Sequence, residues 1–252
     1  MNIIGNILFF YMIIQSTVIL PMIAIPFQIL FNIFRIPISL SKQNARFMMW
    51  IFGWRSVIVE SNTIIKKGFI LPNHRSFFDF IYEVKITDAS ILGRRMAFIV
   101  VSFLGLLCWI EDRCIIFTRN RLSRQQLFGI MEQKLSSSSS RRTEYKNRIV
   151  VFPEGTRLNH LRLSNYQDAK RYFRYGILKS IYQSNNYPVQ LIISKNKELA
   201  INEKSLSLNL NIDIFTAISK PIYPRKYDSF DEFVDGVAKE WYRLWCEVYS
   251  CT

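Results

Sequence analysis

The chain has 252 residues, half of them hydrophobic, and its 33 Lys and Arg against 19 Asp and Glu give a formal net charge of +14. This length suits one large domain with a membrane segment and leaves little room for two full domains. The charge indicates anionic partners, and because the aromatic residues lie mainly in apolar stretches, it favours phosphate groups and membranes over nucleic acid.

The N-terminal segment, residues 1–34, contains no charged side chain, and Arg35 is the first. About 20 apolar residues cross the hydrocarbon core of a bilayer, so the segment is long enough to do so. Pro21 and Pro26 leave two alternatives open, a single kinked helix or a helical hairpin that enters and returns. Because basic residues follow the segment, we expect the rest of the chain on the cytoplasmic face of its membrane.

The remainder, from residue 41 to 252, alternates between apolar runs with strand character and runs with helical spacing. We therefore predict a membrane anchor at residues 1–40 and one α/β domain at 41–252, with a mixed central sheet flanked by helices. Trp50 and Trp54 stand between the two and fit a membrane-interface belt. The expected strands are residues 69–71, 115–117, 148–152 and 189–193.

Helical spacing predicts a helix over residues 122–135, and residues 97–110 read as a core helix or one lying in the membrane surface. Strict alternation of apolar and polar residues over 206–214 predicts a long strand with one wet face. An apolar stripe over residues 230–248 predicts a closing helix that packs on the sheet. Ser229 and Glu232 have the spacing of a capping box at its start.

The first motif with chemical potential is the run from Asn73 to Asp79, which begins where an apolar strand ends at Pro72. His74 and Asp79 are five residues apart and would not share one face of a straight helix. They meet if His74 lies on the turn and Asp79 on the following helix. The carboxylate then fixes the imidazole tautomer and leaves the other ring nitrogen to accept a proton from a hydroxyl.

The second motif is Phe152-Pro153-Glu154-Gly155-Thr156-Arg157, which also follows an apolar strand. Gly155 permits a backbone angle that other residues resist. The Arg157 guanidinium matches a phosphate bidentately, and Glu154 is placed to accept hydrogen bonds from a polyol or to hold Arg157. The four Cys have no metal-ligand spacing and only two His exist, so we expect no metal site.

Together the two motifs resemble those of the lysophospholipid acyltransferase family, the PlsC type, which includes 1-acyl-glycerol-3-phosphate and glycerol-phosphate acyltransferases. Its first motif, N-H-x-S-x-x-D, is matched by Asn73, His74, Ser76 and Asp79, and its third, F-P-E-G-T-R, is matched without a gap by residues 152–157. The resemblance covers roughly residues 55–220. The segment 115–119, which ends at Arg119, is similar to the second motif, although Cys114 and Thr118 depart from its usual Gly and acidic residue.

The resemblance implies an O-acyltransferase that moves an acyl group from acyl-CoA to a lysophospholipid hydroxyl, with no bound cofactor and no obligate protein partner. It makes His74 the general base and Asp79 its orienting acid. It assigns acceptor binding to Asn73, Ser76, Glu154, Gly155, Thr156, Arg157 and Arg119. A general base contributes about 10²–10⁴-fold to such a reaction, and no Ser or Cys nucleophile is needed because the thioester is attacked directly.

The acceptor that the motif set favours is 1-acyl-sn-glycerol-3-phosphate, which would become phosphatidic acid. Glycerol-3-phosphate, or another lysophospholipid with a transacylating donor, remains open, as does a non-catalytic lipid-binding protein. We expect the chain at a membrane, which would be the endoplasmic reticulum or another internal membrane in a eukaryote and the inner membrane in a bacterium.

Overall fold

The computed structural model describes residues 3–14, 25–27, 29–30, 39–94, 102–117, 123–136, 147–158, 162–202, 205 and 207–249. Within them, seven strands form one sheet in the order β1-β9-β6-β2-β5-β3-β4. Only β6 and β9 pair antiparallel in the described sheet, so it is mixed, as predicted. The strands are β1 (Arg55–Glu60), β2 (Gly68–Pro72), β3 (Ser90–Arg94), β4 (Cys114–Phe117), β5 (Arg148–Val150), β6 (Val189–Lys195) and β9 (Asp213–Ile218).

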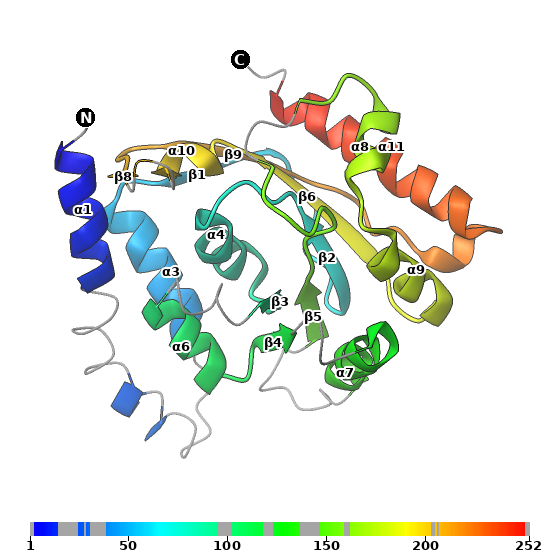
Figure 1. Ribbon diagram of the computed structural model, residues 1–252, viewed down its shortest axis with the longest axis horizontal. Helices are drawn as coiled ribbons and strands as arrows, with labels where there is room; N and C mark the ends of the chain where they lie inside the picture. Colours follow the sequence, from blue (N-terminus) through cyan, green and yellow to red (C-terminus); the bar gives the residue numbers. More distant parts are fainter. Residues whose placement is uncertain are drawn as a thin grey trace.

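Helices cover both faces of this sheet, which gives three layers (Figure 1). One face is covered by α3 (Leu40–Ile51), α4 (Phe78–Thr87) and α6 (Ser102–Ile110). The other is covered by α7 (Arg124–Ser136), α8 (Tyr166–Tyr172), α9 (Tyr175–Ser184) and α11 (Phe230–Tyr249). The short elements are α10 (Lys197–Ala200), η3 (Pro224–Lys226) and the strand pair β7 (Ile201–Asn202) and β8 (Ser207–Leu208).

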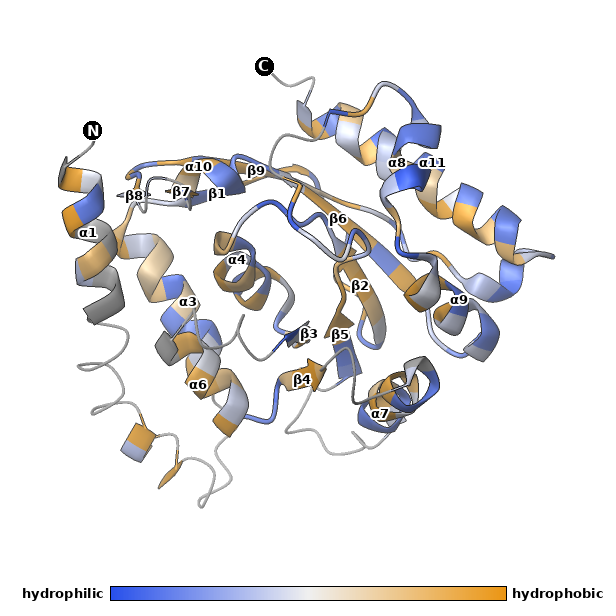
Figure 2. Ribbon diagram, viewed as in Figure 1, coloured by the Kyte–Doolittle hydropathy of each residue, from blue (hydrophilic) through white to orange (hydrophobic). Residues whose placement is uncertain are grey.

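The central strand β2 explains why the sequence forms this layered structure. Phe69 and Leu71 point into the core under α7 and α11, whereas Ile70 points into the core under α4. A strand with helices on both sides needs apolar residues at successive positions, and β2 is hydrophobic along its length, as is the middle of β6 (Figure 2). Burying each such side chain stabilises the fold by about 1.5–3 kcal/mol relative to leaving it exposed.

Most of the predicted elements are present. Strands β2, β4, β5 and β6 and helix α7 lie where the apolar patterns place them, within a few residues at their ends. The closing helix α11 packs on β6 and buries its apolar stripe, including Trp241. Its capping box is altered, because Ser229 Oγ accepts from the Glu232 N–H as expected, but the Glu232 carboxylate accepts from the N–H of Asp228.

The long strand predicted over residues 206–214 is wrong. The chain forms β8 in the two-stranded sheet with β7, and it enters β9 of the seven-stranded sheet only at Asp213. Asn211 takes a left-handed backbone conformation with φ 55°, which interrupts an extended strand. This turn packs against Gly53, whose φ is also positive and where an added Cβ would overlap the Asn211 side chain. Alternation of residue types could not reveal that contact, because its two sides are far apart in sequence.

The predicted membrane anchor lies partly outside the described residues, which exclude 15–24 and 31–38. The described part contains α1 (Ile3–Ile14), a helix of 12 residues that contacts β8. Among the described helices, none combines the length and apolar character that crossing a bilayer requires. The domain boundary near residue 40 and the choice between a single helix and a hairpin stay predictions.

The apolar run at residues 97–110 is described from Ser102 onward, as α6. Leu104, Leu107 and Cys108 are buried against α3 and the sheet, while Trp109 is 64% exposed. The described part is therefore a core helix with one exposed aromatic side chain. Trp54, which was expected in a membrane-interface belt, is 2% exposed and donates its Nε1–H to the Asn209 carbonyl oxygen, so that expectation is wrong for Trp54.

Candidate active site

The two sequence motifs follow β2 and β5, which are parallel neighbours in the sheet. Their carboxyl ends therefore lie at the same edge, where ligands bind in open α/β folds. The motifs are joined directly by hydrogen bonds. The His74 N–H donates to Glu154 Oε2 at 2.9 Å, and the Leu158 N–H donates to the His74 carbonyl oxygen at 2.9 Å. One site with residues from both motifs is thus geometrically possible.

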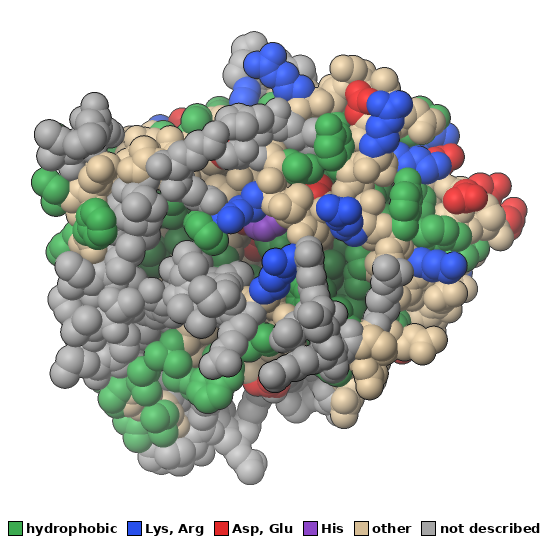
Figure 3. Space-filling view, in the orientation of Figure 1, with side chains coloured by type: hydrophobic (Ala, Val, Ile, Leu, Met, Phe, Trp, Pro, Cys, Tyr) green, Lys and Arg blue, Asp and Glu red, His purple; other side chains and the backbone are tan. Residues whose placement is uncertain are grey.

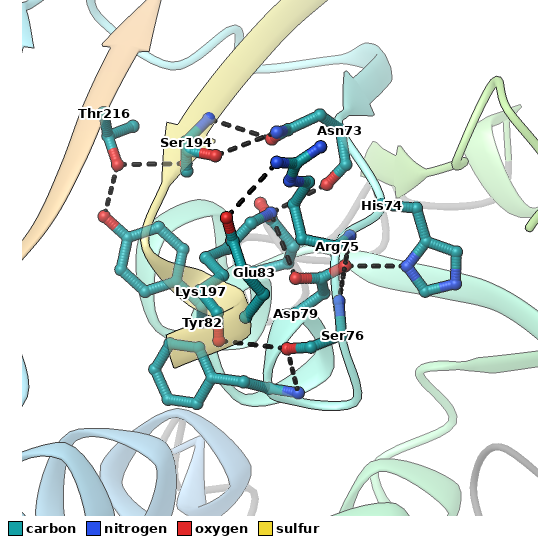
Figure 4. Close-up of polar contacts among 12 residues, drawn as sticks. Asn73, His74, Arg75, Ser76, Asp79, Tyr82, Glu83, Ser194, Lys197 and Thr216 are labelled. Carbon is teal, nitrogen blue, oxygen red and sulfur yellow. Dashed lines mark hydrogen bonds and ion pairs between the residues drawn. The ribbon is translucent and has the colours of Figure 1, made fainter. Parts of the chain in front are cut away.

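Asp79 lies in the first turn of α4 and organises the loop that carries His74. Its Oδ2 is 2.7 Å from His74 Nδ1 and also accepts the backbone N–H groups of Arg75 at 2.5 Å and Ser76 at 3.1 Å. The carboxylate thus binds the loop backbone and the imidazole at once (Figure 4). With Asp79 ionised, Nδ1 carries the proton, and the lone pair of the ring is on Nε2.

The His74 ring is fixed in orientation and still accessible. It stacks on Phe152 with ring centroids 4.1 Å apart, and its side chain is 22% exposed. Among the described residues, Nε2 has no hydrogen-bond partner. In Figure 3 the His side chain of the described residues (purple) is visible at the surface between Lys and Arg side chains (blue). An imidazole held this way can take a proton from a group that enters from solvent or membrane.

A buried ammonium group completes the cluster behind Asp79. Lys197, at the start of α10, is fully buried, and its Nζ lies 3.3 Å from Asp79 Oδ1 and 3.1 Å from Glu83 Oε1. It also donates to the Asn73 carbonyl oxygen at 2.8 Å. Two buried carboxylates, one helical turn apart on α4, therefore share one ammonium, and the first of them contacts the imidazole (Figure 4).

The charge state of this cluster follows from burial and pairing. Burial acts to raise the pKa of Asp79, but the Lys197 ammonium and the hydrogen bond from His74 outweigh it, so the pKa is lowered and Asp79 is ionised. For Glu83, burial and the neighbouring Asp79 prevail, and its pKa rises to about 7. Burial alone would lower the pKa of Lys197, yet the two carboxylates raise it, which keeps the ammonium charged.

Asn73 and Ser76, predicted to bind substrate, support the loop. Asn73 is buried, donates to the Ser194 carbonyl oxygen and accepts the Ser194 N–H, both at 2.8 Å. Ser76 is buried too, and its Oγ donates to the Lys197 carbonyl oxygen and accepts the Phe78 N–H. These bonds use the polar groups of both side chains inside the protein, and acceptor binding by these two residues stays a prediction.

Glu154 is also buried, beneath the backbone of His74. One of its oxygens accepts the His74 N–H, and the other, Oε1, is buried without a hydrogen-bond partner among the described residues. Burial raises the pKa of Glu154 to about 8, so the carboxyl group is mainly protonated at neutral pH. Glu154 therefore fixes the backbone that presents His74.

Gly155, Thr156 and Arg157 form the turn above Glu154. Gly155 has φ +65°, and an added Cβ would lie 2.9 Å from Arg174 Cγ, so the turn requires glycine. Thr156 is exposed and Arg157 half-buried. The Arg157 guanidinium carbon lies 3.8 Å from the Phe77 ring centroid, which holds the cation beside the His74 loop. Arg119 lies outside the described residues. Within them, no group of His, Cys, Asp and Glu could hold a metal ion.

The model of a family described as "Acyltransferase" matches residues 56–193, more than half of the chain. The chain belongs to the acyltransferase family. It is an enzyme of the O-acyltransferase class, and both motifs of the site fall inside the matched region. No curated protein matches the chain significantly.

The fold of this acyltransferase is similar to that in the crystal structure of the 1-acyl-sn-glycerophosphate (LPA) acyltransferase from Thermotoga maritima. The TM-score is 0.67 at 14% sequence identity, and the match covers 100% of this chain and 99% of that chain. The likeness confirms the predicted α/β fold and spans the N-terminal as well as the C-terminal part.

Reasoning from the sequence missed Lys197 and Glu83. A signal for Glu83 was present, because Asp79 and Glu83 are four residues apart on a helix that is otherwise mostly apolar, and two acids on one buried face require a cation. Lys197 had no comparable signal, since its contact with Asp79 joins residues more than a hundred positions apart.

Proposed function

We propose that this acyltransferase moves a fatty acyl group from acyl-CoA to a hydroxyl of a lysophospholipid, with 1-acyl-sn-glycerol-3-phosphate as the acceptor and phosphatidic acid as the product. The observation that supports it best is the 2.7 Å contact between His74 Nδ1 and Asp79, which leaves Nε2 directed away from the buried acid. The activity of the Thermotoga maritima enzyme with a similar fold, a 1-acyl-sn-glycerophosphate acyltransferase, points to the same reaction class.

In the proposed mechanism His74 Nε2 removes the proton of the acceptor hydroxyl as its oxygen attacks the thioester carbonyl carbon. The new C–O bond forms, the C–S bond breaks, and the proton passes from the imidazole to the departing thiolate. Asp79 stabilises the imidazolium that exists in between, and Lys197 stabilises Asp79. No covalent enzyme intermediate forms in this sequence of steps, so the reaction needs no nucleophilic Ser or Cys.

Arg157 is the proposed contact for the acceptor phosphate. Its guanidinium is held by Phe77 next to the His74 loop, and a fork of N–H donors matches phosphate oxygens bidentately. Arg119 is proposed as a second contact. We further propose that the uncharged residues 1–34 attach the enzyme to a membrane, with the catalytic domain on the cytoplasmic face, where both the lysolipid and acyl-CoA are available.

The decisive experiment measures release of coenzyme A by the purified protein in detergent over a panel of lysophospholipids and glycerol-3-phosphate. The wild type should prefer 1-acyl-sn-glycerol-3-phosphate, and His74→Ala should lower kcat by about 10²–10⁴-fold with an unchanged melting temperature. Full turnover by His74→Ala would exclude His74 as the base. A preference for glycerol-3-phosphate or for a phospholipid donor would replace the proposed acceptor or donor.

A second variant tests the phosphate contact separately. Arg157→Gln should raise KM for the phosphate-bearing acceptor by roughly tenfold or more, since a hydrogen bond to a charged group contributes about 1.5–3 kcal/mol. KM for acyl-CoA and the slow rate with an uncharged monoacylglycerol should change little. Equal losses with charged and uncharged acceptors would show that Arg157 supports the loop and does not bind phosphate.

A further inference from the structure

A cavity lies between α3, the start of β1 and the C-terminal half of α4. Its volume is about 700 Å³. It shares no residue with the candidate active site. Its walls are formed by Arg46, Met49, Trp50, Gly53, Trp54, Arg55, Ser56, Lys85 and Asn211.

Three of the wall residues are cations, and two of them are not neutralised. Arg55 pairs with Asp213 at 2.6 Å. Lys85 Nζ donates to the Ser56 hydroxyl at 2.7 Å, and neither Lys85 nor Arg46 has a carboxylate partner among the described residues. Burial and the nearby Arg46 both lower the pKa of Lys85, as expected for two like charges that face one cavity. An anion between them would relieve this repulsion.

The rim of the cavity is aromatic and exposed. Trp50 is 77% exposed, and it stacks with Phe47, whose ring centroid is 6.1 Å away. Phe47 and Ile51 are exposed on the same helix, α3. Large apolar side chains next to cations are typical of surfaces that rest on a lipid headgroup layer, where an indole ring lies at the level of the headgroups.

We propose that this cavity binds the phosphate group of an anionic membrane phospholipid, with Arg46 and Lys85 holding the phosphate and Trp50 and Phe47 entering the headgroup layer. The lipid bound there is not the substrate, because the cavity lacks His74 and every other residue of the candidate active site. It would orient the catalytic domain on the membrane. Since lipid binding can be measured without turnover, the inference does not depend on the proposed reaction.

The test is sedimentation of the full-length protein with vesicles of phosphatidylcholine alone or mixed with phosphatidylglycerol. The variant Arg46→Gln/Lys85→Gln should bind the anionic vesicles about 30-fold more weakly, because each cation near an anionic surface contributes roughly a fivefold factor. The matched control is Arg225→Gln/Lys179→Gln. It removes the same charges from exposed positions on α9, which covers the opposite face of the sheet from α3 (Figure 1), and on η3, which contacts α9. It should bind within about twofold of the wild type.

Two further measurements separate an effect on membrane binding from an effect on folding or catalysis. Trp50→Ala removes a side chain that is mostly exposed, so it should fold normally and should weaken binding to both kinds of vesicle. Activity of Arg46→Gln/Lys85→Gln toward substrates dispersed in detergent should equal that of the wild type.

Three outcomes would overturn the inference. Equal weakening by the two double variants would show that only net charge matters. Unchanged vesicle binding by Arg46→Gln/Lys85→Gln, combined with loss of inorganic phosphate binding in calorimetry, would make the cavity a site for free phosphate. Release of the wild type from vesicles by coenzyme A, with coenzyme A binding lost in Arg46→Gln/Lys85→Gln, would make it part of the donor site.

Discussion

Helix α4 has a buried ion cluster at each end, and the two clusters differ in one respect. At its start, Asp79 and Glu83 meet Lys197, and Asp79 also holds the accessible ring of His74. At its end, Asp88 pairs with the fully buried Arg113 at 2.7 Å.

In the second cluster every carboxylate is paired with a cation, because Asp88 also binds Lys42 at 3.2 Å. Arg113 pairs with Glu111 at 2.7 Å, and the Glu111 carboxylate accepts both the N–H and the hydroxyl of Ser41 at the start of α3. Both clusters pair buried carboxylates with cations, but only in the first does a carboxylate hold an exposed imidazole, which can act as a base. Burial of charge alone therefore does not identify an active site, whereas a buried cluster that ends in an accessible base does.

The largest effect is expected when Lys197 is removed. Lys197→Met leaves two buried carboxylates without a cation, which should lower the free energy of unfolding by about 3–5 kcal/mol. Loss of the ammonium also removes the largest of the interactions that lower the pKa of Asp79. The acid limb of the kcat/KM profile should therefore move to higher pH. Thermal melts and pH–rate profiles measure the two effects.

The double variant Lys197→Met/Glu83→Gln is the control, because it removes one of the two stranded charges. It should be more stable than Lys197→Met alone, and a double-mutant cycle gives the coupling between the two residues. A stability loss with an unmoved acid limb would mean that Lys197 has no influence on Asp79 during turnover.

At the other end of α4, removal of the cation should affect stability alone. Arg113→Met removes the cation that pairs with the buried Glu111 and leaves Asp88 with Lys42 alone. It should cost about 3–5 kcal/mol of unfolding free energy, measured by denaturant titration. The folded fraction should keep the kcat and the pH profile of the wild type. A shifted pH profile in Arg113→Met would remove the distinction between the two clusters.

The smallest effect on activity is expected at Glu154. Its pKa is raised from 4.5 to about 8, so the folded state holds a proton that the unfolded chain releases. The contribution of protonated Glu154 to the free energy of unfolding is then complete below about pH 4.5. This contribution falls as the pH rises toward 8, by up to about 1.4 kcal/mol per pKa unit. Glu154→Gln keeps the shape and the bond to the His74 N–H, so its melting temperature should fall less over this range, with little change in kcat at pH 7.

The same measurement on Glu83→Gln provides a comparison, since the pKa of Glu83 rises only to about 7 and the pH dependence should end earlier. A wild-type melting temperature that stays level between pH 5 and 8 would contradict the assignment of a protonated Glu154.

The sequence alone was sufficient to predict the parts of the fold that depend on a local pattern of apolar residues. The apolar runs that became β2, β5 and β6 and the stripe of α11 were recognisable, because each element is buried along one or two regular faces. The strand predicted across Asn211 does not form, because Asn211 takes a left-handed conformation and packs on Gly53. This contact overrides the alternation of apolar and polar residues.

For the site, the motifs identified His74, Asp79, Glu154 and Arg157 as neighbours. They could not distinguish residues that contact a substrate from residues that hold the loop in place. Asn73 and Ser76 are small polar residues beside a catalytic His, and in sequence such residues look the same whether they face a ligand or the backbone. The structure shows them bonded to Ser194 and Lys197. That contact depends on where β6 and α10 pass the loop, which no local pattern encodes.

Arg75 links the His74 loop to the far end of the described chain. Its guanidinium carbon lies 5.3 Å from the Trp245 ring and 5.6 Å from the Tyr249 ring, both on α11, and β1 pairs only with the late strand β9 in the described sheet. A nascent polypeptide on the ribosome therefore cannot make these contacts of the loop until residue 249 has been made. Fragments that stop short of α11 would leave one face of the sheet uncovered and the loop without its contacts to α11, so premature termination should yield inactive, protease-sensitive products.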